Sequence, residues 1–430
     1  MNVNSIRRLP HAVLVIACAI FAPQVSAAPL EPVMSLAAKE KAPLLDTLKD
    51  LVSIESGSGD REGLDKISEL IANRLRRLGG TVEFIEPMPG DIYKMVDTPK
   101  QIGRMVQARF TGTGTRKILL IAHMDTVYLR GMLARQPFRV DGNRAYGLGI
   151  ADDKQGIAVI LHTLAVLKAM DFRDYALITV LINADEEVSS AGSRATLTKL
   201  GAEHDAVFSC EGSRVDSDRL SLTTAGIAAV VLNVQGRASH AGSAPENGRN
   251  ALYELSHQIL QTRDLSDPKT GLKMNWTVAS AGTNRNVIPA IASATADVRV
   301  LRVADYDGIE EKVTERIKKQ LIPDTKVAMT FERRRPPLEM TPANAALAKH
   351  AQKIYSEVGR QLVIGDVAEG GGTDAAFAAL KTKAPVIERF GLQGFGAHSN
   401  DAEYVYIDSI EPRLYLLSRM IMDVAQGKDK

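Results

Sequence analysis

The sequence predicts an α/β protein, in which a large domain with a mostly parallel central sheet flanked by helices carries an inserted ferredoxin-like α+β domain. Residues 117–122 and 177–182 are continuous apolar runs, which are typical of strands buried on both faces of a parallel sheet. A change of pattern near residue 223 indicates the insertion. With 430 residues, of which 45% are hydrophobic, the chain can form two or three folded domains.

The N-terminal segment has the features of a secretory signal peptide. Arg7 and Arg8 precede a short apolar run over residues 12–22, and small residues follow it. This pattern predicts cleavage after Ala27 and a periplasmic or secreted mature chain. Two alternatives stay open, which are lipoprotein processing at Cys18 and a buried N-terminal helix. No stretch of the chain is apolar for long enough to predict a membrane span.

Charge and cysteine content exclude other classes of protein. The 53 Lys and Arg residues are balanced by 51 Asp and Glu residues, and only 5% of residues are aromatic. Nucleic-acid binding is therefore not expected, because neither a basic surface nor a set of stacking aromatics is indicated. Cys210 would be the sole cysteine of the mature chain, so an exported form would depend on its core or on bound metal instead of a disulfide.

A helix is predicted between the two buried strands, over about residues 153–169. Its apolar side chains recur at helical spacing: Ile157, Ile160, Leu161, Leu164 and Leu167. Strand–helix–strand order predicts that the two strands run parallel. Short apolar strands and helices of the same kind are predicted again near the C-terminus, with the helices over about residues 342–358, 373–380 and 408–425.

The inserted domain is predicted from a β-α-β-β-α-β order of elements. Its strands are expected near residues 227–234, 276–279, 292–300 and 326–332, and its helices around 252–259 and 305–321. Strand 292–300 alternates strictly, with Ala and Val on one face and Ser, Thr, Asp297 and Arg299 on the other. The sheet should therefore have one apolar face for its helices and one polar face.

Residues 333–337, Arg-Arg-Arg-Pro-Pro, are interpreted as the linker that leaves this domain. The predicted organisation is a signal peptide (1–27), a first part of the large domain (28–223), an inserted domain (224–335) and a second part of the large domain (336–430).

Residues that could carry chemistry follow the ends of the buried strands, where open α/β sheets place their ligand sites. They are His123, Asp125, Asp152, Asp153, Asp185, Glu186, Glu187, Glu211 and His398. Imidazoles and carboxylates without thiolates suit zinc in a hydrolytic site, and two His with three acids suffice for two ions if one carboxylate bridges them. Each residue taken alone could instead be a helix cap or a solvated loop residue.

Two of these pairs suggest specific roles. In His123-Met-Asp125, the carboxylate is placed to accept the imidazole N–H and orient the ring. If the backbone stays extended, Glu186 and Glu187 point in opposite directions, so one can bind metal while the other acts as a general base. Cys210 is expected in the core, and Gly370–Thr373 lacks the lysine of a phosphate-binding loop.

Seven motifs, in chain order, resemble the dinuclear zinc exopeptidases. This family includes aminoacylases, succinyl-diaminopimelate desuccinylase and, as the nearest match, the bacterial glutamate carboxypeptidases. The motifs cover residues 123–128, 149–154, 184–187, 236–242, 286–289, 296–299 and 370–374.

The resemblance implies a metal centre with two Zn²⁺ ions per subunit. It implies that His123 and Glu211 bind one ion, that Glu187 and His398 bind the other, and that Asp152 bridges them. It also implies that the Asp152–Asp153 peptide bond is cis.

The resemblance further implies that Asp125 orients a ligand, that Glu186 is the general base, and that His240 stabilises the oxyanion in the active site of a partner subunit. The inserted domain would form the homodimer across its sheet edge.

It also implies that Arg299 and Asn286, with backbone near Gly371, hold the carboxylate of the substrate. Arg299 lies on the polar face of its strand, where a guanidinium can bind a carboxylate through two hydrogen bonds. A salt bridge to Asp297 is the alternative for Arg299.

The expected function is that of an exported zinc carboxypeptidase that hydrolyses the amide bond to a C-terminal amino acid. Glutamate is the leading expectation, in folate-type or acyl- or peptidyl-glutamate substrates. The alternatives are an N-acyl-amino-acid amidohydrolase or dipeptidase with the same centre, and a non-catalytic periplasmic zinc- or peptide-binding protein. Two departures bear on folate specificity: residues 188–192 lack an expected lysine, and Gly212-Ser-Arg214 stands where Pro-Thr is usual.

Overall fold

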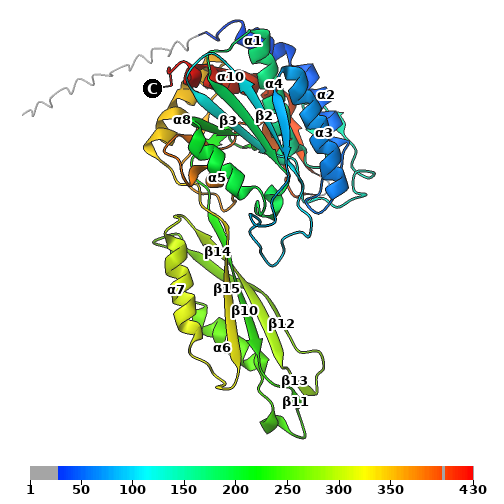
Figure 1. Cartoon of the computed structure of the whole chain (residues 1–430), viewed down its shortest axis with the longest axis vertical. Coiled ribbons are helices and arrows are strands. Elements are labelled where there is room, and N and C mark those ends of the chain that lie inside the picture. Colours follow the sequence, from blue (N-terminus) through cyan, green and yellow to red (C-terminus); the bar gives the residue numbers. More distant parts are fainter. Residues whose placement is uncertain (1–27, 400–401, 430) are drawn as a thin grey trace, which may run out of the picture.

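The computed structural model describes residues 28–399 and 402–429, which form a broad α/β domain and a long, narrow domain that projects from it (Figure 1). The predicted signal peptide and Cys18 lie outside the described residues. Within the described part, no helix is both long and apolar enough to cross a membrane. We call the elements from β10 to β15 (residues 226–335) the inserted domain and the remainder the large domain.

The large domain is built on a six-stranded sheet that is parallel at its centre. The strand order is β1 (Thr81–Ile85), β2 (Met105–Thr111), β6 (Leu177–Asn183), β3 (Lys117–His123), β7 (Ala206–Ser209) and β17 (Val386–Ile387). Strand β3 pairs in parallel with β6 and β7, and β17 pairs in parallel with β7. Strands β1 and β2 extend one edge in antiparallel pairing, so the prediction of a mostly parallel sheet is confirmed.

Helices cover both faces of this sheet, because successive side chains of a strand point to opposite faces. In β3, Ile118 and Leu120 join one core cluster, whereas Leu119 and Ile121 join another. The first cluster includes side chains of α2 (Lys41–Val52), α3 (Arg61–Leu78), α4 (Gln155–Ala169), α8 (Pro342–Glu357) and α10 (Ile410–Ala425). The second includes side chains of α5 (Arg194–Glu203) and α9 (Asp374–Ala379). A short helix, α1 (Val33–Lys39), packs on the first side.

The inserted domain has the predicted ferredoxin-like arrangement. Its antiparallel sheet has the order β12 (Lys273–Ala281), β14 (Ile291–Val300), β10 (Gly226–Gln235) and β15 (Lys326–Arg335). Helices α6 (Ala251–Thr262) and α7 (Asp305–Ile317) pack on its apolar face through a separate core cluster. Figure 1 shows both helices on one side of the strands, with β11 (Ser239–His240) and β13 (Val287–Ile288) at the far tip.

Two boundaries of this domain differ from the sequence-based expectation. Helix α7 ends at Ile317 instead of residue 321, because the backbone N–H groups of Leu321 and Ile322 donate to the carboxylate of Glu254 at 2.9 and 2.7 Å. Strand β15 continues through Arg335, which pairs with Ile227 of β10. Arg333–Arg335 are therefore the end of a strand and not a linker.

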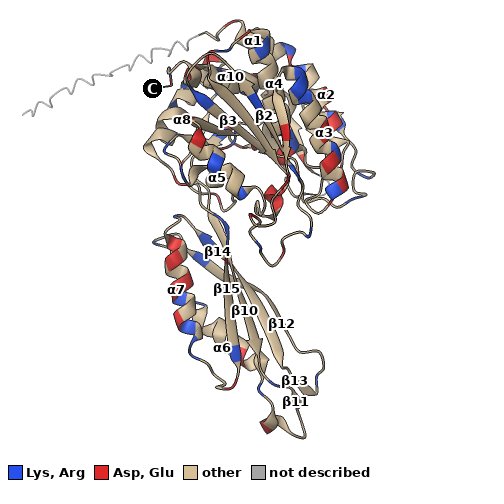
Figure 2. Cartoon of the chain, in the orientation of Figure 1, with Lys and Arg blue, Asp and Glu red and all other residues tan. Residues whose placement is uncertain are grey.

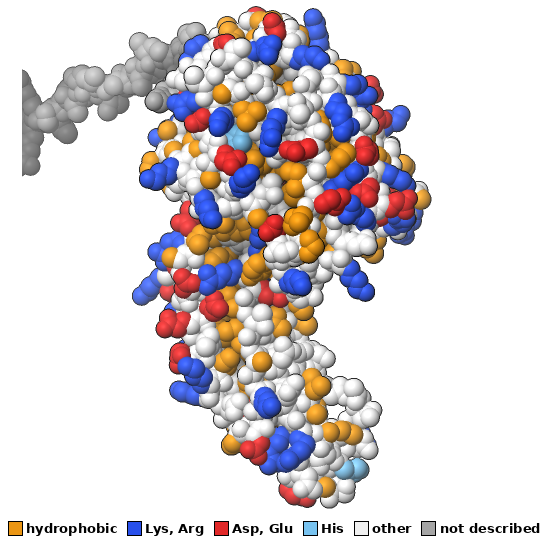
Figure 3. Space-filling model, viewed as in Figure 1, with side chains coloured by type: hydrophobic (Ala, Val, Ile, Leu, Met, Phe, Trp, Pro, Cys, Tyr) orange, Lys and Arg blue, Asp and Glu red, His pale blue; other side chains and the backbone are white. Residues whose placement is uncertain are grey.

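The surface carries charges of both signs. Charged residues are frequent on helices such as α3 and α7, while the strands are mostly uncharged (Figure 2). On the face shown in Figure 3, basic and acidic side chains of the described residues are interspersed over the large domain. This distribution agrees with the balanced composition.

A smaller sheet completes the rim of the large domain. It has the order β4 (Arg139–Asp141), β5 (Arg144–Tyr146), β19 (Tyr404–Tyr406), β18 (Gln393–Phe395) and β8 (Ser213–Arg214). Strand β9 (Arg219–Ser221) pairs with β16 (Val363–Gly365) beside it. This rim holds the loops that follow the carboxyl ends of β7 and β18.

Candidate metal centre

The five predicted metal ligands come together at the carboxyl ends of the parallel strands. His123 is the last residue of β3, Glu187 lies in a turn after β6, and Glu211 follows β7. Asp152 lies in an irregular turn (Ile150–Lys154) before α4, and His398 lies in the loop after β18. The position agrees with the general location of ligand sites in open α/β sheets.

Asp152 lies between the two histidines. Its Oδ1 is 3.0 Å from Nε2 of His123, and its Oδ2 is 3.3 Å from Nε2 of His398. Glu211 Oε1 is 3.8 Å from Nε2 of His123, whereas Glu187 Oε2 is 3.1 Å from Nε2 of His398. Each carboxylate oxygen of Asp152 therefore faces a different His–Glu pair, as a bridging ligand requires.

The donor atoms form two groups that suit metal ions. Ligand atoms of His123, Glu186 and Glu211 lie within 4.8 Å of one another, and so do those of Asp152, Glu187 and His398. Oε1 of Glu187 is buried without a hydrogen-bond partner among the described residues, which a cation would resolve. Nitrogen and carboxylate donors without thiolates fit zinc in a hydrolytic centre.

Burial and hydrogen bonding shift the pKa values of these groups in the metal-free chain. Hydrogen bonds to Asp152 and Glu187 raise the pKa of His398 to about 10. Burial raises the pKa of Glu187 to about 7, although His398 opposes the shift. Burial tends to raise the pKa of Asp152, but the hydrogen bonds from His123 and His398 outweigh this effect, so the pKa of Asp152 is lowered. Metal binding at this site would therefore displace protons.

Asp125 connects the first histidine to the turn that carries the two glutamates. Nδ1 of His123 is 3.1 Å from the backbone carbonyl of Asp125 and 3.4 Å from its carboxylate. The same carboxylate accepts hydrogen bonds from the N–H groups of Glu186 and Glu187, at 3.0 and 3.1 Å, and from Ser58 Oγ at 2.7 Å. Asp125 can thus orient both the imidazole ring and the turn that carries Glu186, the predicted general base.

Glu403 fixes the turn that carries Asp152. Its buried carboxylate accepts hydrogen bonds from the N–H groups of Gly149, Ala151 and Asp152 at 2.8–3.1 Å, and from Tyr128 Oη at 2.5 Å. The Asp152–Asp153 peptide bond in this turn is cis, as the resemblance implied. The sequence did not single out Glu403, because it lies 251 positions from Asp152 and joins it only through the fold.

The side chains of Glu186 and Glu187 point in different directions for a different reason from the one expected. Their backbone is not extended but forms a short 3₁₀ turn, Glu186–Val188. The turn still directs the two carboxylates to different groups of ligand atoms. Glu186 therefore lies beside the centre, where a base must be to reach an attacking water.

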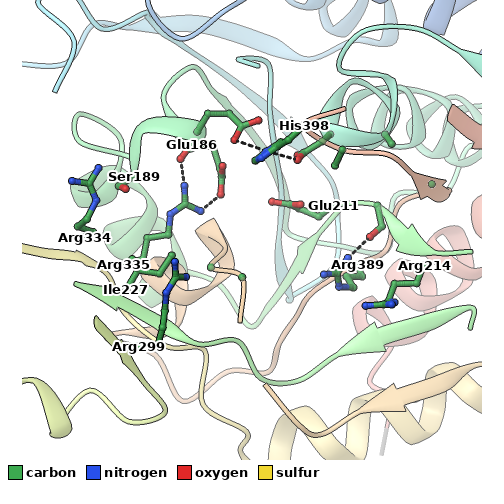
Figure 4. Close-up of a pocket in the computed structure, with 18 of the residues that line it drawn as sticks. Glu186, Ser189, Glu211, Arg214, Ile227, Arg299, Arg334, Arg335, Arg389 and His398 are labelled. Atoms are coloured by element: carbon green, nitrogen blue, oxygen red, sulfur yellow. Dashed lines mark hydrogen bonds and ion pairs between the residues drawn. The ribbon is translucent and has the colours of Figure 1, made fainter. Parts of the chain in front are cut away.

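Arg335 is a residue of this site that the sequence reasoning missed. Its guanidinium contacts both the carboxylate and the backbone carbonyl of Glu186, as the dashed lines in Figure 4 show. The aliphatic part of its side chain packs against Gly372: a Cβ added at Gly372 would lie 2.5 Å from Cδ of Arg335. The assignment of residues 333–337 to a linker concealed this role. Only the pairing of Arg335 with Ile227, which places Arg335 in strand β15 and not in a linker, reveals it.

Arg299 lies at the base of the inserted domain, facing the centre across a cavity of about 830 Å³. Its guanidinium pairs with Asp297 at 2.8 and 3.0 Å, which is the alternative that the sequence left open. It also donates to the carbonyl of Gly370 at 2.7 Å, next to Gly371, which lines the same cavity. Arg299 and Gly371 are thus brought together within one chain.

His240 and Asn286 are not brought to the metal centre of their own chain. Both lie at the far tip of the inserted domain, where Ala241 N donates to the carbonyl of Asn286 at 2.9 Å. Nδ1 of His240 accepts from the N–H groups of Gly242 and Ser243, so Nε2 is left without a partner among the described residues. Strand β14 separates Asn286 from Arg299 by more than about 25 Å, at roughly 3.3 Å per residue.

Comparison with known proteins agrees with this geometry. Residues 119–423 match the model of peptidase family M20/M25/M40. Carboxypeptidase G2 from Pseudomonas sp. (strain RS-16) is 44% identical over 392 residues, which cover 91% of this chain and 92% of that protein.

Solved structures share the fold. The aminopeptidase PepT from Bacillus cereus superposes with a TM-score of 0.70 at 20% identity, covering 90% of this chain and 99% of that one. An M20 family metallo-carboxypeptidase from Sulfolobus solfataricus also gives a TM-score of 0.70, at 15% identity, with 88% and 98% covered.

Proposed function

The chain belongs to peptidase family M20/M25/M40 and is a metallo-exopeptidase, and we propose that it is a zinc carboxypeptidase that releases C-terminal glutamate from acyl- or peptidyl-glutamate substrates. The observation that carries the chemistry is the Asp152 carboxylate between His123 and His398, with Glu186 beside it. Similarity to a carboxypeptidase over most of both chains supports hydrolysis at the C-terminal residue.

His123 and Glu211 would hold one zinc ion, Glu187 and His398 the other, and Asp152 would bridge them. Zinc at these residues would supply Lewis acidity for water activation and carbonyl polarisation. Glu186 accepts the proton of the attacking water and passes it to the leaving nitrogen. Asp125 keeps Glu186 in place through the N–H bond to its backbone.

The free carboxylate of the substrate would bind at the base of the inserted domain. Arg299 presents its guanidinium there beside Gly371, and both line the cavity that contains the metal ligands. Asn286 would contribute to the same carboxylate, and His240 to the oxyanion, from the partner subunit of a homodimer. Their distance from Arg299 within one chain supports this arrangement.

Strand β12 is the element through which the dimer would form. It is an edge strand of the inserted sheet, and its middle is exposed, with Val278 63% exposed. An open strand edge presents unpaired backbone groups and is a template for pairing with a second chain. The basic and apolar N-terminal pattern supports export to the periplasm or the medium.

A substrate panel tests this function. The zinc-loaded protein would be assayed against a series of acyl-amino acids that share one acyl group, and against dipeptides, with the Glu186→Gln variant as inactive control. We expect the highest kcat/KM for glutamate as the leaving amino acid. A preference for another amino acid would contradict the glutamate assignment, and higher activity on dipeptides would favour a dipeptidase. Absence of any amide hydrolysis would contradict the proposed carboxypeptidase function.

A further inference from the structure

Five arginines line the cavity that contains the metal centre, and four of them already have acidic partners. Arg214 pairs with Asp216 and Glu369, Arg299 with Asp297, Arg334 with Asp97 and Glu332, and Arg335 with Glu186. Arg389 is different, since no carboxylate of the described residues forms an ion pair with it. The neighbouring Glu388 interacts with it electrostatically but forms no ion pair. A partly buried guanidinium without an ion-paired carboxylate is suited to an anionic ligand.

The side chain of Arg389 is held in place by neutral groups. Nη1 donates to the carbonyl of Gly212 at 2.7 Å, and Nε donates to Ser221 Oγ at 3.1 Å. Nη2 makes no hydrogen bond to any described residue, so it remains available to a ligand. Two of the five N–H groups thus orient the guanidinium, while the other three can still donate hydrogen bonds to a ligand.

The backbone at Arg389 is also fixed in an unusual conformation. Its φ is 76°, in the left-handed region that a non-glycine residue seldom adopts. The carbonyl of Arg389 accepts a hydrogen bond from Arg413 Nη1 at 2.8 Å, and the N–H of Phe390 donates to Ser209 at 2.9 Å. Non-glycine residues held in this region cluster at ligand sites.

The position of Arg389 indicates which part of a substrate it meets. Figure 4 shows Arg389 and Arg214 on the side of Glu211, whereas Arg299, Arg334 and Arg335 lie on the side of Glu186. In the proposed reaction Glu186 protonates the leaving nitrogen, so the leaving amino acid extends toward Arg299. The acyl group then extends in the other direction, past Glu211.

We propose that Arg389 forms an acyl-group subsite that binds a carboxylate, so that the preferred substrates carry a negative charge on the acyl side as well as on the leaving amino acid. Arg214, two residues after the Gly212 that Arg389 contacts, lines the same wall, but its charge is paired with Asp216 and Glu369, so Arg389 is the group left to bind a carboxylate there. This inference rests on the proposed function, because it assumes which side of the centre the leaving amino acid occupies.

The test compares two substrates that differ only in the charge of the acyl group. N-succinyl-glutamate carries the carboxylate, and N-succinamoyl-glutamate replaces it by a neutral amide of nearly the same shape. For the zinc-loaded protein we expect kcat/KM to favour the succinyl substrate by about 10- to 100-fold, as for a charge-assisted hydrogen bond. Arg389→Gln should reduce this ratio to near one, mainly through the succinyl substrate.

Two further variants separate binding from structure. Arg389→Lys retains the charge and should retain part of the preference. Arg173→Gln is the matched control, because Arg173 is exposed and contacts Thr111 at the opposite end of the sheet, and it should leave the ratio unchanged. Zinc content, measured for every variant, reports whether the nearby Glu211 is disturbed.

The failures of the two proposals are distinguishable. If the wild-type protein hydrolyses both substrates equally well, the acyl subsite is wrong while the carboxypeptidase function stands. A loss of activity by the same factor on both substrates in Arg389→Gln would show a purely structural role and would overturn the subsite. If Arg389→Gln instead loses a wild-type preference for glutamate over glutamine as leaving group, Arg389 binds the leaving side chain and the assignment to the acyl side is wrong. Absence of hydrolysis of any acyl-glutamate by the wild-type protein would remove the proposed function, and the subsite with it.

Discussion

The large domain and the inserted domain present their functional residues in opposite ways. In the large domain, His123, Asp125 and Glu187 are each less than a tenth exposed at the side chain, and every one of them has a partner within the chain. His398 is 56% exposed, but it too has partners, Asp152 and Glu187. In the inserted domain, His240 is exposed at the tip, and its Nε2 has no partner among the described residues.

This difference follows from how each domain is covered. The parallel strands of the large domain end at a site that helices and loops surround, so candidate metal-binding residues that are far apart in sequence meet there. The inserted sheet has helices on one face only, and its polar face and its tip project from the molecule (Figure 1). The candidate metal ligands therefore all lie within one chain, whereas the proposed substrate site would require residues from two.

The largest expected effect tests whether the metal centre is complete in one chain. Removal of zinc by a chelator should abolish hydrolysis, and zinc should restore it, with two ions per chain by elemental analysis. His240→Ala should still bind two ions, because its side chain lies at the tip of the other domain. One ion or none per active chain would contradict the two-metal centre.

The same experiment has a pH dependence with a definite sign. Glu187, with a raised pKa of about 7, and His398, with a raised pKa of about 10, bind protons that zinc must displace. The affinity for zinc should therefore fall as the pH is lowered from 8 to 6. Calorimetric titration in buffers of different ionisation enthalpy would measure the protons released. Affinity that is independent of pH over this range would contradict the expectation.

The next effect separates the two adjacent glutamates. Glu186→Gln should bind zinc normally but lose about 10²–10⁴ in kcat, because an amide cannot accept the proton of the attacking water. Glu187→Gln should instead lower the affinity for zinc. Turnover and metal content, measured on both variants, check this division of roles. Near-normal turnover of Glu186→Gln would show that another residue is the base.

A somewhat smaller effect tests whether the inserted domain acts across the dimer. His240→Ala should cost roughly 2.7–4 kcal/mol in activation free energy, as for a lost oxyanion donor. Its structural stability should not change, since the side chain is exposed.

Mixed dimers then show whether His240 acts in the active site of its own subunit or in that of the partner. When Glu186→Gln subunits exchange with His240→Ala subunits in equal amounts, about a quarter of the sites should be intact if His240 acts in the partner. If activity stays at the baseline of the single variants although exchange is demonstrated, His240 does not act across the dimer.

The smallest effect concerns the base of the inserted domain, where the two domains meet in one chain. Amidation of the C-terminal carboxylate should lower kcat/KM by the equivalent of about 1.5–3 kcal/mol, because Arg299 then faces a neutral group. Arg299→Met should remove most of this discrimination, while Arg302→Met, on an exposed turn nearby, should preserve it. Equal kcat/KM for acid and amide with the wild-type protein would exclude a carboxylate site at Arg299.

The hydrophobic pattern was sufficient to predict most of the fold. Continuous apolar runs identified β3 and β6, and strict alternation identified β14, because side-chain period reports how many faces of a strand are buried. The end of α7 could not be predicted in the same way. It depends on Glu254, which is far from residue 321 in sequence and captures the backbone N–H groups there.

The candidate metal ligands that the structure brings together could also be predicted from the sequence, because polar residues at the ends of buried strands and a set of ordered motifs both pointed to them. What the sequence determined was therefore the chemical type of each residue and the strand end that carries it. The tertiary structure alone decided the partners: Arg335 on Glu186, Glu403 on the turn of Asp152, and Arg299 on Asp297. These contacts join residues whose separation or orientation no local pattern encodes, since they depend on how strands and loops from distant segments pack against one another.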